Sequence, residues 1–133
     1  MERYLYFRTE ATDANDDATG DSACLPASSL MGMQPTSDTA LTLYFKPIVR
    51  YHPGGAADSS ANLANHDSVI LNLTTANTHL ACITAIVKHV NKRSDLSLLV
   101  VANDDSGGTE YLSGSGISSC GAINIAAAYT NAW

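Results

Sequence analysis

An acidic segment near the start of the chain carries oxygen-bearing side chains at alternate positions. Asp13, Asn15 and Asp17 match the opening of a calcium-binding loop, because a hard cation takes several oxygen ligands from one short turn. The match ends there, since Ala18 stands at the position of the sharp-turn glycine and Cys24 at that of the bidentate glutamate. We therefore predict solvated loop carboxylates and no metal site, with a weak ion site at an assembly interface as the alternative.

Ser, Cys and His side chains could supply a nucleophile and a base. The segment 113–121 is rich in Ser and Gly, yet it is not G-x-S-x-G and no helix is expected after it. The cysteines form no C-x-x-C pair, and the histidines show neither i, i+4 spacing nor an H-E-x-x-H motif. We predict buried thiols, no catalytic residue and no cofactor. A Cys24–Cys120 bridge stays open, as does a small hydrolase with a histidine close to Cys82, Cys120 or Ser115. The histidines are His52, His66, His79 and His89.

Tyrosines occupy outward or edge positions of the first two predicted strands. Amphipathic side chains of this kind are enriched where protein surfaces meet. The alternative is ordinary cross-strand packing between Tyr6 and Tyr44. Apolar residues follow the acidic segment, where a merely solvated loop would not need them, and packing of these residues on the chain's own core is the alternative to an interface role. The candidate interface residues are Tyr4, Tyr6, Leu30, Met31, Met33, Tyr44, Tyr51 and Trp133.

Size and charge bound the class of protein. The chain has 133 residues, 45% of them hydrophobic, and a formal net charge of -6, which predicts a single domain over residues 1–133. The acidic charge argues against a nucleic-acid partner, because such proteins neutralise phosphates with Lys and Arg. The longest apolar runs are far shorter than the roughly 20 residues that cross a bilayer, and the charged N-terminus does not read as a signal peptide. We expect no membrane partner and no secretion.

Alternating hydrophobicity predicts strands in the first half of the chain. In residues 3–9, Leu5 and Phe7 face one side and the tyrosines face the other. Residues 40–46 alternate in the same way, and Pro47 then suggests an edge or a bulge. Two segments show neither the helical nor the strand period of hydrophobic residues and are predicted as long loops. They are 10–35, a loop or extended arm, and 52–66, a flexible loop.

A strand, a helix and a second strand are predicted in the second half. The first strand covers 67–74, and the helix begins after Asn77 or Thr78 and ends near Asn91. The second strand, 96–102, is almost continuously apolar, which is typical of a central strand covered on both sides. The apolar stripe of the helix comprises Leu80, Ile83, Val87 and Val90, with Ile86 beside it. Short strands are also predicted at 109–112 and 122–128.

The fold class that these elements predict is α+β. We expect five to seven strands in a mostly antiparallel or mixed sheet, one helix packed on a face, and long loops. If the two strands around the helix lie in one sheet, their crossover should be right-handed.

Four segments of the chain carry a resemblance to known proteins: MERYLYFRTEATDANDDATGDS, LTLYFKP, SVILNLT and SGISSCGAI. The pattern resembles small virion structural proteins of tailed phages that infect marine bacteria and cyanobacteria. The resemblance implies a non-enzymatic capsid decoration or cement protein, made in the host cytoplasm and located in the virion. It also implies dimers or trimers, a major capsid or other virion protein as partner, and no cofactor. A tail or fibre component and a small carbohydrate- or ligand-binding module are the alternatives.

Overall fold

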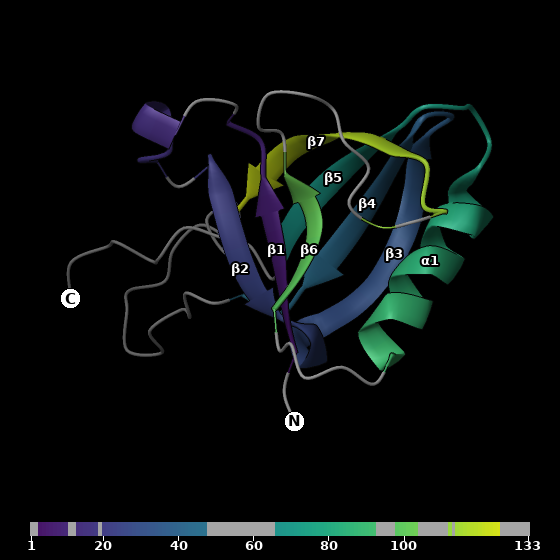
Figure 1. The fold of residues 1–133 in the computed structure, drawn as a ribbon, viewed down its shortest axis with the longest axis horizontal. Coiled ribbons are helices and arrows are strands. Elements are labelled where there is room, and N and C mark those ends of the chain that lie inside the picture. Colours follow the sequence, from purple (N-terminus) through teal and green to yellow (C-terminus); the bar gives the residue numbers. More distant parts are fainter. Residues whose placement is uncertain are drawn as a thin grey trace, which may run out of the picture.

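Two β-sheets and one α-helix make up the part of the chain that the structure describes (Figure 1). This computed structural model describes residues 3–10, 13–18, 20–47, 66–92, 98–103, 112 and 114–125. The predicted α+β class is confirmed. The strands are β1 (Tyr4–Arg8), β2 (Ser22–Pro26), β3 (Leu30–Ser37), β4 (Ala40–Phe45), β5 (Asp67–Leu73), β6 (Leu98–Asn103) and β7 (Ile117–Asn124). The α-helix is α1 (His79–Asn91), and short 3-10 turns lie at Asp13–Asn15 and Ala27–Ser29.

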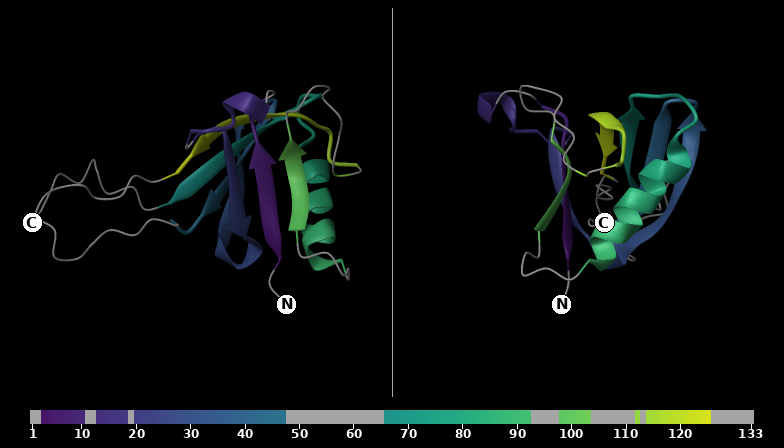
Figure 2. Two further views of the ribbon diagram at one scale, coloured as in Figure 1. Left: turned by 60° about the vertical axis from the view of Figure 1, so that its left-hand side comes forward. Right: turned by 45° about the vertical axis from the view of Figure 1, so that its right-hand side comes forward.

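The two sheets differ in size and in strand direction. The three-stranded sheet has the order β2-β1-β6, in which β1 is antiparallel to β2 and parallel to β6. The four-stranded sheet has the order β3-β4-β5-β7 and is antiparallel throughout. Figure 2 shows the sheets facing each other, with α1 on one side of the space between them. The strands on either side of α1, β5 and β6, therefore belong to different sheets.

The hydrophobic core lies between the facing surfaces of the two sheets. Leu5 and Phe7 of β1 are fully buried, as are Leu43 and Phe45 of β4. The rings of Phe7 and Phe45 meet edge to face with centroids 5.8 Å apart. Such a pair contributes about 0.5–1.5 kcal/mol beyond the burial of its area. This contact joins the central strand of one sheet to an inner strand of the other.

The helix packs on the core with only part of its predicted apolar stripe: Ile83 and Val90 lie against the core, but two other residues of the stripe do not. Its buried residues are Cys82, Ala85 and Ile86, whereas Leu80 is 77% exposed and Val87 is 44% exposed. The prediction is therefore wrong for Leu80 and Val87. The predicted N-cap position, Thr78, and the predicted end of the helix at Asn91 are confirmed. Polar contacts at the two ends of the helix explain the difference, because they fix its rotation.

Each end of α1 is held by a side chain that binds backbone carbonyls. At the first turn, Nε2 of His79 lies 2.8 Å from the Ser37 oxygen and 3.0 Å from the Ala40 oxygen, both in the β3–β4 hairpin. At the last turn, the Arg3 guanidinium donates to the carbonyls of His89, at 3.0 Å, and Lys92, at 2.8 Å. A cation is stabilised at this end by the helix dipole. The helix is thus tied to both sheets.

The predicted arm over residues 10–35 is wrong for most of its length. Residues 22–26 form β2 against β1, and residues 30–37 form β3 against β4. The sequence does not predict these strands because they bury few side chains. In β2, for example, Leu25 is the only fully buried residue. The predicted loop 52–66 lies outside the described residues except for its last residue.

Two further predictions on strands need correction. Strand β6 is an edge strand among the described strands, not a central one, because β1 is the one described strand that it pairs with. The last strand begins at Ile117, inside the Ser- and Gly-rich segment 113–121 and ahead of the predicted start at residue 122, and ends at Asn124. Ile117 and Cys120 point into the core, so the small residues between them belong to a strand. The predicted strand 109–112 lies outside the described residues apart from Leu112.

Gly121 of β7 allows close approach to the central strand β5. A Cβ at this position would lie 3.1 Å from the Ile70 carbonyl oxygen and 3.2 Å from two side-chain carbons of Ile70. We expect Gly121→Ala to lower the free energy of unfolding by about 1–3 kcal/mol, since β5 is paired on both sides and cannot move away.

Gly32 of the edge strand β3 supplies the matched control. A Cβ there meets no atom within 4 Å, so Gly32→Ala should leave stability unchanged or raise it. Denaturant unfolding of both variants measures the difference. Equal stabilities for the two variants would contradict the packing described at Gly121.

Candidate functional site

The outer surface of the three-stranded sheet is lined by apolar side chains. Strand pairing places Tyr4 between Pro26 and Leu98, and it places Tyr6 between Cys24 and Val100. These two cross-strand rows point away from the core, because Leu5 and Phe7 alternate with them along β1. We refer to the six residues as the apolar face: Tyr4, Tyr6, Cys24, Pro26, Leu98 and Val100.

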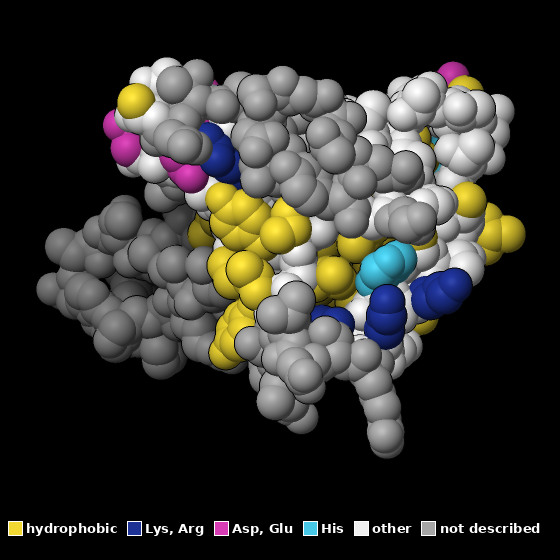
Figure 3. All heavy atoms as spheres, in the orientation of Figure 1, with side chains coloured by type: hydrophobic (Ala, Val, Ile, Leu, Met, Phe, Trp, Pro, Cys, Tyr) yellow, Lys and Arg dark blue, Asp and Glu magenta, His cyan; other side chains and the backbone are white. Residues whose placement is uncertain are grey.

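The apolar face is accessible in the single chain. Tyr4 is 43% exposed and Leu98 is 50% exposed, while Tyr6 and Val100 are half-buried. Figure 3 shows hydrophobic side chains gathered over these strands, in the middle of the view. Adjacent apolar residues of this kind mark surfaces that other molecules cover, whereas singly scattered ones need no explanation.

The outer surface of the four-stranded sheet has the opposite character. Its side chains bond to one another across strands: the hydroxyls of Thr36 and Thr42 lie 2.9 Å apart, and Asn72 donates to Ser119 at 2.9 Å. The Tyr44 hydroxyl donates to the side chain of Gln34 at 3.2 Å. This surface suits contact with water. The contrast between the two outer surfaces singles out the apolar face.

Prolines occupy the outer edges of strands β2 and β3. Ala27 N donates to Arg3 O in the β1–β2 pair, so the alternate residue Pro26 faces the open edge. Leu73 N donates to Thr39 O in the β4–β5 pair, which by the same alternation turns Pro35 of β3 outward. Proline has no N–H to offer an added strand, so it blunts a sheet edge. The face of the three-stranded sheet is therefore a better contact surface than these edges.

The acidic segment forms a loop that is organised by its own carboxylates. The Asp21 carboxylate accepts hydrogen bonds from the backbone N–H of Asp17, at 3.1 Å, and of Ala18, at 2.8 Å. Asp16 accepts from the Ser22 hydroxyl at 2.8 Å and lies 3.8 Å from Nε of the buried Arg8. Within the described residues, no three His, Cys, Asp or Glu side chains are grouped as metal ligands would be. The loop presents negative charge next to the end of β1.

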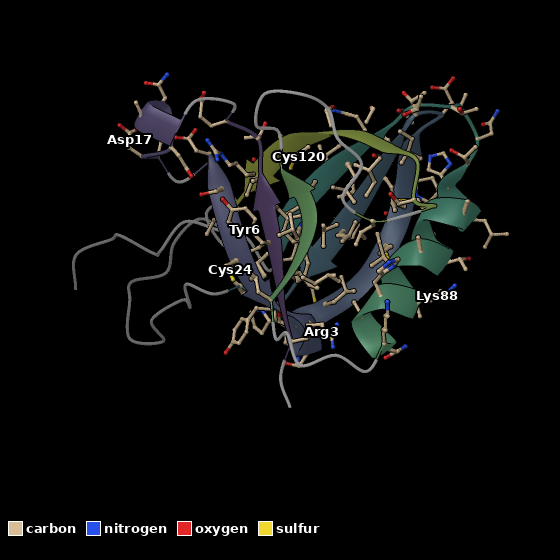
Figure 4. All side chains as sticks on the ribbon, in the orientation of Figure 1. Arg3, Tyr6, Asp17, Cys24, Lys88 and Cys120 are labelled. Carbon is tan, nitrogen blue, oxygen red and sulfur yellow. The ribbon has the colours of Figure 1, made fainter. Side chains whose placement is uncertain are left out.

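Basic side chains gather at the other end of the apolar face, around the C-terminus of α1. Arg3 binds the last carbonyls of the helix, and Lys88 and Lys92 are exposed beside it. In Figure 4, Tyr6 and Cys24 lie between Asp17 at one end and Arg3 and Lys88 at the other. Opposite charges therefore flank the apolar face.

The predicted interface residues fall into separate places. Tyr4 and Tyr6 lie together in the apolar face, but Tyr44 belongs to the other sheet, where its ring meets His66 edge to face at 5.2 Å. The predicted Tyr6–Tyr44 cross-strand pair is therefore wrong. In β3, Leu30 and Met33 pack against the core and Met31 is 52% exposed. Tyr51 and Trp133 lie outside the described residues.

Four residues of the apolar face were missed in the sequence, although one signal was present. In LSLLVVA, Leu98 and Val100 are apolar at alternate positions, which was interpreted as burial on both sides of a sheet. An apolar residue on the outward side of an edge strand has the same pattern. Cys24 and Pro26 gave no signal, because β2 was not predicted.

The candidate nucleophiles are placed where they serve the fold. The buried Ser115 donates from its hydroxyl to Leu112 O at 2.7 Å and accepts from Ile117 N at 3.3 Å, which stabilises the turn before β7. Cys82 and Cys120 are buried thiols as predicted, whereas Cys24 is exposed, so that prediction is wrong for Cys24. Cys24 and Cys120 are not joined by a disulfide.

The described histidines have other partners than these nucleophiles. The His66 ring meets that of Tyr44 edge to face, His79 bonds to the β3–β4 hairpin, and Nδ1 of His89 lies 2.7 Å from Ala85 O. Two of the three rings thus serve the helix ends. His52 lies outside the described residues.

Comparison with known proteins identifies no relative: no protein-family model, curated protein or solved structure matches the chain. Among the described residues, no helix combines the length and the hydrophobicity needed to cross a membrane.

The exposure of Cys24 predicts selective thiol chemistry. In the folded protein at low concentration, a maleimide should label Cys24 rapidly and leave the buried Cys82 and Cys120 unmodified. Desolvation by its neighbours raises the pKa of the Cys24 thiol. Because the thiolate is the nucleophile, labelling at pH 8 should be slower than for an unstructured cysteine peptide and should accelerate as the pH rises.

Mass spectrometry of the labelled chain measures the site, and Cys24→Ser is the control. Rapid labelling of two or more thiols in the folded protein would contradict the placement of these residues.

Proposed function

We propose that this chain is a non-enzymatic virion structural protein that decorates a capsid and stabilises it by associating with copies of itself and with the shell. The observation that supports the proposal is the apolar face. Its two tyrosines and two exposed or half-buried aliphatic residues lie on hydrogen-bonded strands of one sheet. Aromatic residues are enriched at protein–protein interfaces, and charged residues are depleted at their centres.

The paired backbone of this sheet favours protein contacts over catalysis as the role of the face. The backbone of paired strands is already ordered before a partner covers it, which lowers the entropic cost of association. Tyr4 and Tyr6 stand in the central strand β1, so a partner can contact both without displacing a loop. A decoration protein needs such a surface, because it gains its binding energy from contact alone.

A carbohydrate-binding module is the other function considered for exposed tyrosines. Such a site pairs aromatic rings with hydrogen-bonding groups such as Asp and Asn, which orient a polar ligand. In the apolar face the immediate neighbours of Tyr4 and Tyr6 are Cys24, Pro26, Leu98 and Val100. This apolar environment supports a protein partner over a sugar. A tail or fibre component would use the same surface and is distinguished by its partner.

Substitution of Tyr6 tests the proposal. We expect the wild-type protein to form a dimer or trimer in sedimentation velocity and to co-sediment with empty capsid shells of tailed phages from marine bacteria or cyanobacteria. Tyr6→Ser should weaken self-association by at least about 10-fold, since aromatic residues at the centre of an interface contribute most to its affinity. Thermal unfolding checks that the variant is folded.

Leu80→Ser is the matched control, because Leu80 is the most exposed large apolar residue in the described part of the chain and lies on the helix, away from the apolar face. It should associate like the wild type. A wild-type protein that remains monomeric and ignores the shells would overturn the proposal. If Leu80→Ser weakens association as much as Tyr6→Ser does, the helix is the contact surface instead.

A further inference from the structure

The apolar face alone is too small to hold a stable pair of molecules. Three strands about 4.8 Å apart and five residues long, at about 3.3 Å per residue, give a projected area of roughly 240 Å². A stable interface buries about 800 Å² on each partner. A partner that covers this face must therefore also contact elements at its rim, which among the described residues include the acidic loop and the C-terminal end of α1.

These two rims carry opposite charges on the same side of the molecule. Asp16, Asp17 and Asp21 belong to the acidic loop, and Lys88 and Lys92 lie at the helix end. Figure 3 shows the acidic group at the upper left, the basic group at the lower right, and the hydrophobic side chains between them. A partner that fits this surface has a basic end and an acidic end, separated by an apolar centre.

A second copy of this chain has that pattern. In a twofold interface the same surface is used by both molecules, so a contact between residues i and j occurs twice. Consider a twofold axis that lies in the plane of contact between the two apolar faces, at right angles to the line between the charged ends. The acidic loop of each copy then meets the helix end of the other. The surface is complementary to itself under this operation alone.

We infer that two copies of the chain pack their apolar faces against each other about such a twofold axis, with Asp17 of each copy near Lys88 of its partner. The inference rests on the proposed function, of which it specifies the self-association. Tyr4 and Tyr6 then form the dry centre, and the charged ends set the orientation of the two molecules. Electrostatic complementarity of this kind fixes register and speeds encounter.

Charge reversal at both ends gives a test specific to this arrangement. Both side chains are exposed. The Asp21 carboxylate accepts its hydrogen bonds from the backbone N–H of Asp17 and Ala18, so Asp17→Lys leaves them in place. Asp17→Lys and Lys88→Glu should each weaken dimerisation by about 10-fold at low salt, because each reversal places like charges together at two sites of the dimer. Sedimentation equilibrium in a buffer of low ionic strength measures the dissociation constants.

Mixing the two variants is the decisive experiment. A dimer of one Asp17→Lys chain with one Lys88→Glu chain has opposite charges at both contacts, so the mixture should regain an affinity close to that of the wild type. The double variant on one chain should do the same. Asp38→Lys is the control for net charge, since Asp38 is exposed in the β3–β4 turn and should leave dimerisation unchanged.

Cys24 distinguishes a twofold dimer from a head-to-tail chain of molecules. It pairs with Tyr6 across strands β1 and β2, one strand away from the central strand of the apolar face. In the twofold arrangement the two Cys24 thiols lie close enough for a short bis-maleimide to join them into a species of twice the 14.0 kDa chain mass. In a head-to-tail arrangement this crosslink should not form, and larger oligomers should appear.

The outcomes separate the inference from the proposed function. If Tyr6→Ser weakens association but the mixture of charge variants regains nothing and Cys24 does not crosslink, the twofold arrangement is wrong and self-association stands. If the wild-type protein does not associate at any concentration, both are overturned. Recovery in the mixture together with the Cys24 crosslink supports both.

Discussion

The packing of the three-stranded sheet on the four-stranded sheet is the contact on which the other features depend. Leu5 and Phe7 of β1 are buried against the opposite sheet, with Phe7 in edge-to-face contact with Phe45. Since side chains alternate along a strand, burial of these two residues forces Tyr4 and Tyr6 outward. The apolar face is thus the necessary reverse side of the core. The outer side of this sheet is unusual because its residues are apolar, as are those of the buried side.

The positions of the charges follow from hydrogen bonds that tie the surrounding segments to this sheet. Arg3, directly before β1, binds the carbonyls at the end of α1 and so fixes the basic helix end beside the sheet. Arg8, at the end of β1, lies near Asp16 and bonds to Glu10 O at 2.6 Å, which fixes the acidic loop at the opposite end. One short strand therefore sets the distance between the two charged ends.

Sequence patterns predicted the elements that bury a regular apolar face. The strands at β1, β4 and β5 and the limits of α1 follow from alternation and capping. Strand β2 was not predictable in this way, because Leu25 alone is fully buried. The rotation of α1 depends on the bonds of His79 and Arg3 to distant carbonyls, which no local pattern encodes. Of the candidate surface, Tyr4 and Tyr6 were predicted, and their neighbours on β2 and β6 required the strand order.

The concentration dependence of Cys24 labelling tests most directly whether the apolar face is covered in the assembled protein. Cys24 belongs to this face and is exposed in the single chain, whereas the other two cysteines are buried. The maleimide rate at Cys24 should fall as the protein concentration rises, with a midpoint equal to the dissociation constant from sedimentation. A rate that is the same in the monomer and in the assembled protein would show that association leaves the apolar face uncovered.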